Sequence, residues 1–174
     1  WTLVAYLIIH RDRGIPSQEL IDLLWPEAES DNPVSKLQNN VSRARSALSD
    51  LGLSDTKNLI KYDAGLYRWA PDYRTVTDYE TFEKSAKSVI TETDINKQIK
   101  YGINAVSQYI GDFLPEASLE FWCINMNAYY RSLYLKTCNE TVSKLIEVNR
   151  YDTAKDICLK VISSDPSLEE FSVS

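Results

Sequence analysis

Residues 32–48 read NPVSKLQNNVSRARSAL, a segment in which apolar and polar residues alternate with the period of an α-helix. Leu37, Val41, Ala44 and Leu48 follow one another at steps of four, three and four, so they form one apolar stripe. The pattern predicts an amphipathic helix with one buried side. At 100° per residue the opposite face carries Ser35, Asn39, Ser42, Arg43 and Ser46, and Lys36, Gln38 and Arg45 lie on its flanks.

The outer face of this predicted helix has the chemistry that a DNA major groove accepts. No acidic residue occurs between positions 34 and 49, although the chain as a whole is acidic. Amide side chains pair with adenine and arginine pairs with guanine, while short hydroxyl side chains allow a close approach to the backbone. A solvated surface helix of a small helical domain has the same periodicity, so the neighbouring segments must decide between the two interpretations.

The composition is that of a globular protein built mainly from helices. The chain has 174 residues, of which 44% are hydrophobic and 25% charged, with only five Gly and six Pro. No apolar run is long enough to cross a membrane, and we see no signal peptide. Three widely spaced cysteines, no CxxC motif and a single histidine predict no metal site and three buried, reduced thiols in a cytoplasmic protein.

The net charge of −6 is unevenly distributed along the chain. Residues 1–70 carry eight Lys or Arg against nine Asp or Glu, whereas residues 71–174 carry eleven against sixteen. The first part is therefore nearly neutral, and its positive charge is concentrated on the predicted helix. DNA binding needs such a local concentration, because affinity for the backbone comes from neutralised phosphates.

The segments around this helix predict a winged helix-turn-helix domain over residues 1–72. Residues 1–10 are typical of a short buried helix, and residues 17–25 of a second helix with Ser17 as its N-cap. An acidic loop over 26–33 precedes the long helix, and Gly52 follows it as a candidate C-cap. Two short β-prone runs, 58–62 and 66–70, are joined by a turn over 63–65 and predict a β-hairpin wing.

Residues 76–174 predict an all-α domain with TPR-like helical pairs. Apolar stripes recur with helical spacing, a long helix is expected over 129–149, and an antiparallel partner over 151–163. Asp112, Glu116 and Glu120 recur at fourfold spacing, but the sequence offers no second histidine, phosphate-binding glycine loop or nucleophile motif beside them. We therefore predict no catalytic residue, no cofactor and no enzyme activity.

Several motifs in this order resemble one bacterial family. LVAYLIIHRDRGIPSQELIDLLWP, LQNNVSRARSAL and LIKYDAGLYRW resemble an OmpR-type winged helix, and YIGDFLP at 109–115 is similar to a signature of the SARP/BTAD activators. The chain departs from that family in two ways. No strands precede Trp1 and the second domain stops at Ser174, so we expect both ends to be cut and an N-terminal receiver or sensor domain to be missing. The wing turn carries Asp63 and Ala64 instead of a basic residue.

These observations predict a sequence-specific DNA-binding transcriptional regulator. Arg43 is the first candidate for a base contact, and Asn39 and Ser42 share its face. The remaining candidates for contact with double-stranded DNA are Ser35, Lys36, Gln38, Asn40 and Arg45 on the helix, with Lys61 and Arg68 on the wing. The resemblance implies binding as a homodimer. It also implies activation through RNA polymerase, with the loop acids Glu27, Glu29 and Asp31 as the contacts.

One different class of protein stays open. The chain could be a helical adaptor whose winged helix docks a protein instead of DNA. The near-neutral charge of residues 1–70 and the non-basic wing turn favour the adaptor, whereas the uninterrupted positive face of the long helix favours DNA.

Overall fold

The computed structural model describes residues 1–26, 32–70, 72–117 and 120–164. The chain divides into two compact units, Trp1–Thr75 and Val76–Ser174, which we call unit 1 and unit 2. The described residues are mostly helical, with one small antiparallel sheet, so the prediction of a mainly α protein is confirmed.

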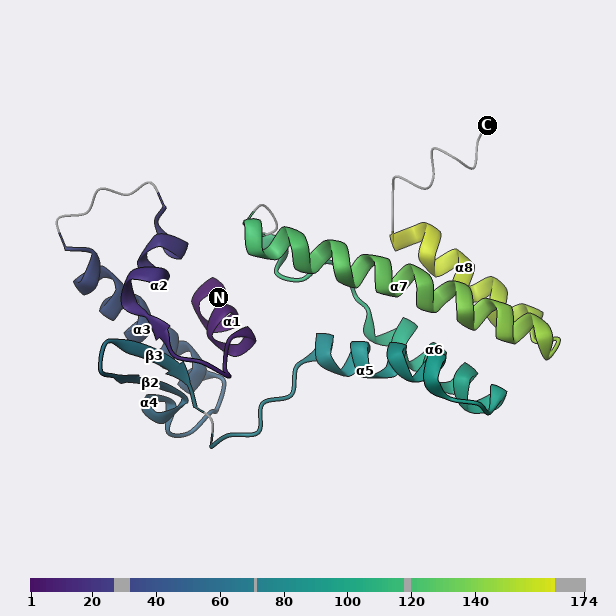
Figure 1. Cartoon of the computed structure of the whole chain (residues 1–174), viewed down its shortest axis with the longest axis horizontal. Helices are drawn as coiled ribbons and strands as arrows, with labels where there is room; N and C mark the ends of the chain where they lie inside the picture. The colour runs from purple at the N-terminus through teal and green to yellow at the C-terminus, as the bar shows by residue number, and fades with distance from the viewer. Residues whose placement is uncertain (27–31, 71, 118–119, 165–174) are drawn as a thin grey trace. The chain divides into compact units, whose positions relative to one another are not determined.

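Unit 1 combines helices with the sheet (Figure 1). Strand β3 lies in the middle of the sheet and pairs with the other two strands in antiparallel register. The described elements are α1 (Thr2–Ile9), β1 (Ile15–Pro16), α2 (Ser17–Leu24), α3 (Pro33–Asp50), α4 (Thr56–Leu59), β2 (Ile60–Asp63) and β3 (Leu66–Trp69).

Helix α3 forms where the apolar stripe predicted it. The Asn32 side chain accepts a hydrogen bond from the Ser35 amide at 3.0 Å and caps the helix, and Pro33 occupies the first helical position. At the other end the C-cap is Leu51, one residue before the predicted Gly52, which follows it with a left-handed φ of 84°. The stripe itself is buried against the core of unit 1, through Leu37, Val41 and Leu48, with Ala44 packed at its edge.

The hairpin differs from the prediction at its first strand. The predicted strand 58–62 begins two residues later, because residues 56–59 form the short helix α4 before β2 starts. The turn has two residues, Ala64 at φ 48° and Gly65 at φ 83°, because Asp63, which was predicted to belong to it, is the last residue of β2. The third strand, β1, has only two residues and was not predicted from the sequence.

Ser17 does not cap α2 as predicted. The N-cap residue is Pro16, and Ser17 is the first helical residue, whose hydroxyl donates to the carbonyl of Gly65 at 3.2 Å. The strand pairing of Pro16 with Leu66 brings Ser17 beside the hairpin turn, so its hydroxyl joins the sheet instead of the helix end.

Unit 2 is a stack of paired helices: α5 (Asp78–Thr91), α6 (Ile95–Gln108), α7 (Phe121–Glu147) and α8 (Tyr151–Ser164), with a short 3₁₀ turn at Pro115–Ala117. Helix α6 packs on α5 and α7, and α8 lies antiparallel to α7 (Figure 1). Helix α7 starts eight residues before the predicted position 129. Because α5, α6 and α8 all contact α7, it has no single polar side, and its periodicity gave a poor guide to its length.

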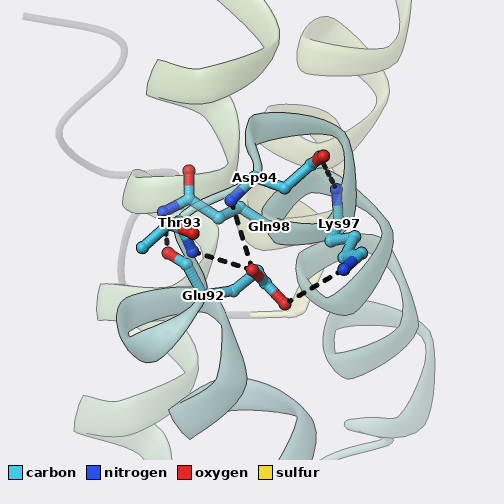
Figure 2. Close-up of polar contacts among 5 residues, drawn as sticks. All are labelled: Glu92, Thr93, Asp94, Lys97 and Gln98. Carbon is cyan, nitrogen blue, oxygen red and sulfur yellow. Dashed lines mark hydrogen bonds and ion pairs between the residues drawn. The ribbon is translucent and has the colours of Figure 1, made fainter.

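The turn between α5 and α6 is held by a cluster of polar contacts (Figure 2). Glu92 accepts backbone hydrogen bonds from Thr93 at 2.9 Å and Asp94 at 3.2 Å, and these bonds lower the pKa of its carboxyl group. Asp94 caps α6 by accepting from the Lys97 amide at 3.0 Å, and Gln98 donates to the Glu92 carbonyl at 2.7 Å. The turn fixes how α5 and α6 pair.

The cysteines depart from the prediction at one position. Cys123 and Cys138 are buried, and burial raises the pKa of each thiol to about 11. Cys158 is exposed, although three buried thiols were expected. It lies on the outer side of α8, a face that the sequence alone could not assign to solvent. No helix among the described residues is long and apolar enough to span a membrane.

Candidate nucleic-acid interface

The outer face of α3 carries most of the predicted contact residues. Gln38, Asn39, Ser42 and Arg43 are exposed, and the helix itself carries no acidic residue between Val34 and Ser49. Ser35 and Asn40 are half-buried at the margins of the face. Arg43 and Asn40 also line a surface groove of about 420 Å³ beside the start of α1. The structure thus brings the predicted base-contacting residues together on one accessible surface.

Lys36 lies at the edge of this face and is held by an aromatic ring. Its ammonium group stands 4.3 Å from the centre of the Trp25 ring, at the end of α2. A cation over an aromatic face is attracted by the ring's quadrupole. The contact fixes Lys36 beside the start of α3 while leaving its charge unneutralised.

Arg45 has a role that sequence reasoning missed. Its Nη2 donates to the Ile60 carbonyl at 2.6 Å, and its Nε is buried without a hydrogen-bond partner among the described residues. Ile60 begins strand β2, so this side chain ties α3 to the hairpin. The helical wheel placed Arg45 beside the apolar stripe, and that border position is the signal that could have identified it as a packing residue.

The two basic residues of the hairpin face the same way. Lys61 and Arg68 are direct partners in the β2–β3 register, and directly opposite residues share one face of a sheet. Lys61 forms a 2.9 Å ion pair with Asp72, whereas Arg68 is exposed and extends over Gly14. A Cβ at Gly14 would lie 3.0 Å from the Arg68 guanidinium carbon, so the glycine leaves room for this arginine.

A charged cluster around Glu19 connects α1 to α2. Glu19 accepts hydrogen bonds from Arg13 at 2.6 and 3.0 Å and from the Tyr6 hydroxyl at 2.8 Å. The Arg13 bond is the main reason why the pKa of Glu19 lies below its ordinary value. His10 packs against Tyr6 with the two rings tilted at 59°, and burial lowers the pKa of the imidazole. This cluster stabilises the scaffold and lies outside the outer face of α3.

The remaining predicted contacts cannot be placed. Glu27, Glu29 and Asp31, the residues predicted to contact RNA polymerase, lie outside the described residues. Within the described part of the chain, no group of three or more His, Cys, Asp or Glu could hold a metal ion.

No family model matches the chain, and no curated protein is significantly similar to it. Among solved structures it is similar to Mycobacterium tuberculosis EmbR in complex with low affinity phosphopeptide, with a TM-score of 0.71 and 14% sequence identity. The chain shares the fold of that structure. The similarity covers 95% of this chain and 44% of the EmbR chain, so the chain spans less than half the length of that structure. At this identity the similarity establishes a shared fold alone.

Proposed function

We propose that this chain is a sequence-specific DNA-binding transcriptional regulator of the SARP type. In this proposal unit 1 is a winged helix-turn-helix, α3 enters the major groove, and the β2–β3 hairpin is the wing against the sugar–phosphate backbone. Unit 2 is a TPR-like activation domain. The observation that carries the proposal is the outer face of α3, which presents Asn39, Ser42 and Arg43 on a stretch of helix that has no acidic residue from Val34 to Ser49.

The predicted contact residues take different roles in this interface. Arg43 reads a guanine edge, and Asn39 pairs with an adenine or a neighbouring polar edge. Lys36, Lys61 and Arg68 neutralise phosphates, with Ser35 and Ser42 close to the backbone and Gln38 and Asn40 at the margins. Arg45 acts by positioning, because its bond to the Ile60 carbonyl sets the hairpin relative to α3. Binding as a homodimer to repeated half-sites is part of the same proposal.

Activation would run through the loop between α2 and α3. By resemblance to OmpR-type activators, Glu27, Glu29 and Asp31 contact RNA polymerase. Reversing these three charges should reduce transcription from a target promoter and leave DNA affinity unchanged. An equal loss of both would refute the polymerase contact.

The DNA-binding proposal is tested by selection from a randomised duplex pool. Wild-type protein should enrich one sequence motif, and Arg43→Ala should lose that enrichment. Arg150→Ala is the matched control, since Arg150 is an exposed arginine of unit 2 and should leave selection unchanged. If Arg43→Ala still enriched the same motif, the proposal that α3 recognises bases would be refuted.

A protein-docking adaptor is the second candidate, and the charges on the wing favour it. Lys61 is partly neutralised by Asp72, and the hairpin turn begins with an exposed aspartate, Asp63. In that case unit 1 would bind a protein surface, and duplex DNA would not bind even at low salt. Salt-sensitive duplex binding excludes the adaptor, because such sensitivity arises from counterions released at phosphates.

A further inference from the structure

Unit 2 contains a pocket that the proposed DNA-binding role does not use. It has a volume of about 440 Å³ and lies between the first turn of α5, the loop over residues 109–115 and helix α7. This volume falls in the range of pockets that bind small molecules. The pocket is formed by residues of unit 2 alone.

The pocket wall is aromatic. The ring centres of Tyr79 and Phe113 are 5.6 Å apart and meet edge to face, and Tyr79 and Tyr130 are also 5.6 Å apart. Phe82 joins the same wall, 5.4 Å from Tyr109 and 6.3 Å from Tyr130. Five rings therefore border one hollow, and the face of an aromatic ring carries a partial negative charge.

The loop that closes the pocket is held in place by its backbone. The Phe113 amide donates to the side chain of Asn127 on α7 at 2.7 Å. The next residue, Leu114, has a φ of 45°, a conformation that a non-glycine residue keeps only where its surroundings fix it. The Phe113 ring also meets Trp122 edge to face at 6.0 Å. The wall is therefore arranged before any ligand arrives, which reduces the ordering entropy of binding.

The charged groups that line the pocket are both acidic. These are Asp78 and Asp112, and both are exposed. Arg131 lies outside this lining, in a neighbouring hollow that shares Asp112. The N-terminus of α5 would otherwise attract an anion. Here, however, Thr77 and Glu80 form a capping box, and the Tyr79 amide donates to Asp78 at 2.8 Å. The amide groups at this helix end therefore already donate hydrogen bonds to acceptors from the same chain.

Tyr130 lies on the buried side of the pocket, and burial raises the pKa of its hydroxyl. The Glu83 carboxylate raises this pKa further, although Glu83 is itself paired with Lys87 at 2.6 Å. An anionic ligand would meet the two rim carboxylates, Asp78 and Asp112, whereas a cation would be attracted by them.

We propose that this pocket binds a small organic cation with an alkylammonium or quaternary ammonium head group. The head group lies against the faces of the aromatic rings, and Asp78 and Asp112 neutralise its charge at the rim. Attraction between a cation and ring faces strengthens when the cation leaves water, which an aromatic pocket of this size allows. Such binding would give the chain a ligand-sensing function in unit 2. It does not depend on the proposed DNA binding, so the two proposals can fail separately.

Three probes of equal shape test the proposal on the full chain. Choline, its neutral carbon analogue dimethylbutanol and the anion dimethylbutanoate share a branched head group of the same shape. This group is cationic in choline and neutral in the other two, and dimethylbutanoate carries its negative charge on the carboxylate at its other end. Binding is followed by amide shifts in heteronuclear NMR, with Gly111 and Phe113 as reporters inside the pocket. Choline should shift these amides and bind about fivefold tighter than dimethylbutanol, a difference typical of a cation on aromatic faces. Dimethylbutanoate should bind most weakly.

Charge-removing variants that keep the shape locate the site. Asp78→Asn and Asp112→Asn should each weaken choline binding about threefold, the size of a partly exposed ion pair. Asp152→Asn is the matched control, because Asp152 is an exposed aspartate in the first turn of α8 and does not line the pocket. Equal binding of choline and dimethylbutanol, tighter binding of the anion, or shifts absent from Gly111 and Phe113 would each overturn the proposal. An equal effect of Asp152→Asn would do the same.

Discussion

Replacing Gly102 with alanine is expected to destabilise unit 2, although alanine is the better helix former. Gly102 lies within α6, where it faces Thr141 of α7. A Cβ at this position would lie 2.0 Å from the Thr141 Oγ1, 2.7 Å from its Cγ2 and 2.8 Å from its Cβ. Thr141 is fully buried, and its hydroxyl donates to the Thr137 carbonyl at 2.6 Å, so it has little room to move.

Three contributions set the size of the effect. Alanine gains about 1 kcal/mol over glycine in a helix interior. Overpacking of a tight core costs about 1–3 kcal/mol. Displacing the Thr141 hydroxyl from its bond to Thr137 costs about 1 kcal/mol more. The net loss for Gly102→Ala is therefore about 2 kcal/mol in the free energy of unfolding of unit 2.

Native-state hydrogen exchange measures this change without assuming that the two units unfold together, because slow amides of α6 and α7 report the opening of unit 2. The double variant Gly102→Ala/Thr141→Ala should recover part of the loss, since Thr141→Ala removes two of the three clashing atoms. Lys100→Ala, on the exposed side of α6, is the control and should change stability by less than about 0.5 kcal/mol. A stabilised Gly102→Ala variant would refute the close contact of α6 with α7.

Three further predictions concern single side chains. Arg45→Met keeps the apolar stem but loses the bond to the Ile60 carbonyl, so unit 1 should lose about 1.5–3 kcal/mol of stability in hydrogen exchange; unchanged protection in β2 would contradict the tie between α3 and the hairpin. The pKa of Glu19 is lowered by Arg13, so its contribution to stability is present above the ordinary value of 4.5 and is lost as pH falls through the folded-state pKa. The Glu19→Gln variant should therefore have a lower free energy of unfolding than wild type at neutral pH, and this difference should vanish in acid. A difference that stays constant with pH would contradict the stabilising contact between Glu19 and Arg13. Cys158 should react with a thiol reagent at neutral pH much faster than the two buried cysteines, and Cys158→Ser should remove the fast phase, whereas a persistent fast phase would contradict the burial of the others.

The sequence predicted the central helix well because its apolar stripe is long, and Leu37, Val41 and Leu48 are buried as expected. The ends were predicted to within one residue: Pro33, assigned to the preceding loop, starts the helix, and Leu51 takes the C-cap position given to Gly52. The helix packs on one side only, which is the condition under which a periodic pattern is informative. The hairpin turn was predictable for a similar reason, since its two left-handed residues require particular turn chemistry.

What the sequence could not predict depends on partners distant in the chain. Strand β1 has two residues and forms only because β3 offers an edge, and Ser17 contacts Gly65 for the same reason. Lys36 lies over Trp25 and Arg45 reaches Ile60, so two of the predicted DNA contacts have neighbours that a helical wheel does not show. Burial by several neighbours likewise concealed the start of α7.

The most direct test of DNA recognition by α3 is the salt dependence of affinity for a duplex selected from the randomised pool. Fluorescence anisotropy at several salt concentrations gives the slope of log K against log salt. With phosphate contacts from Lys36, Lys61 and Arg68, the slope should be about −2.7 per chain. Arg43→Ala should leave this slope unchanged and weaken binding by about 1–3 kcal/mol, the usual size of one bidentate base contact. Binding that is absent at low salt, or that neither depends on salt nor weakens in Arg43→Ala, would contradict the account.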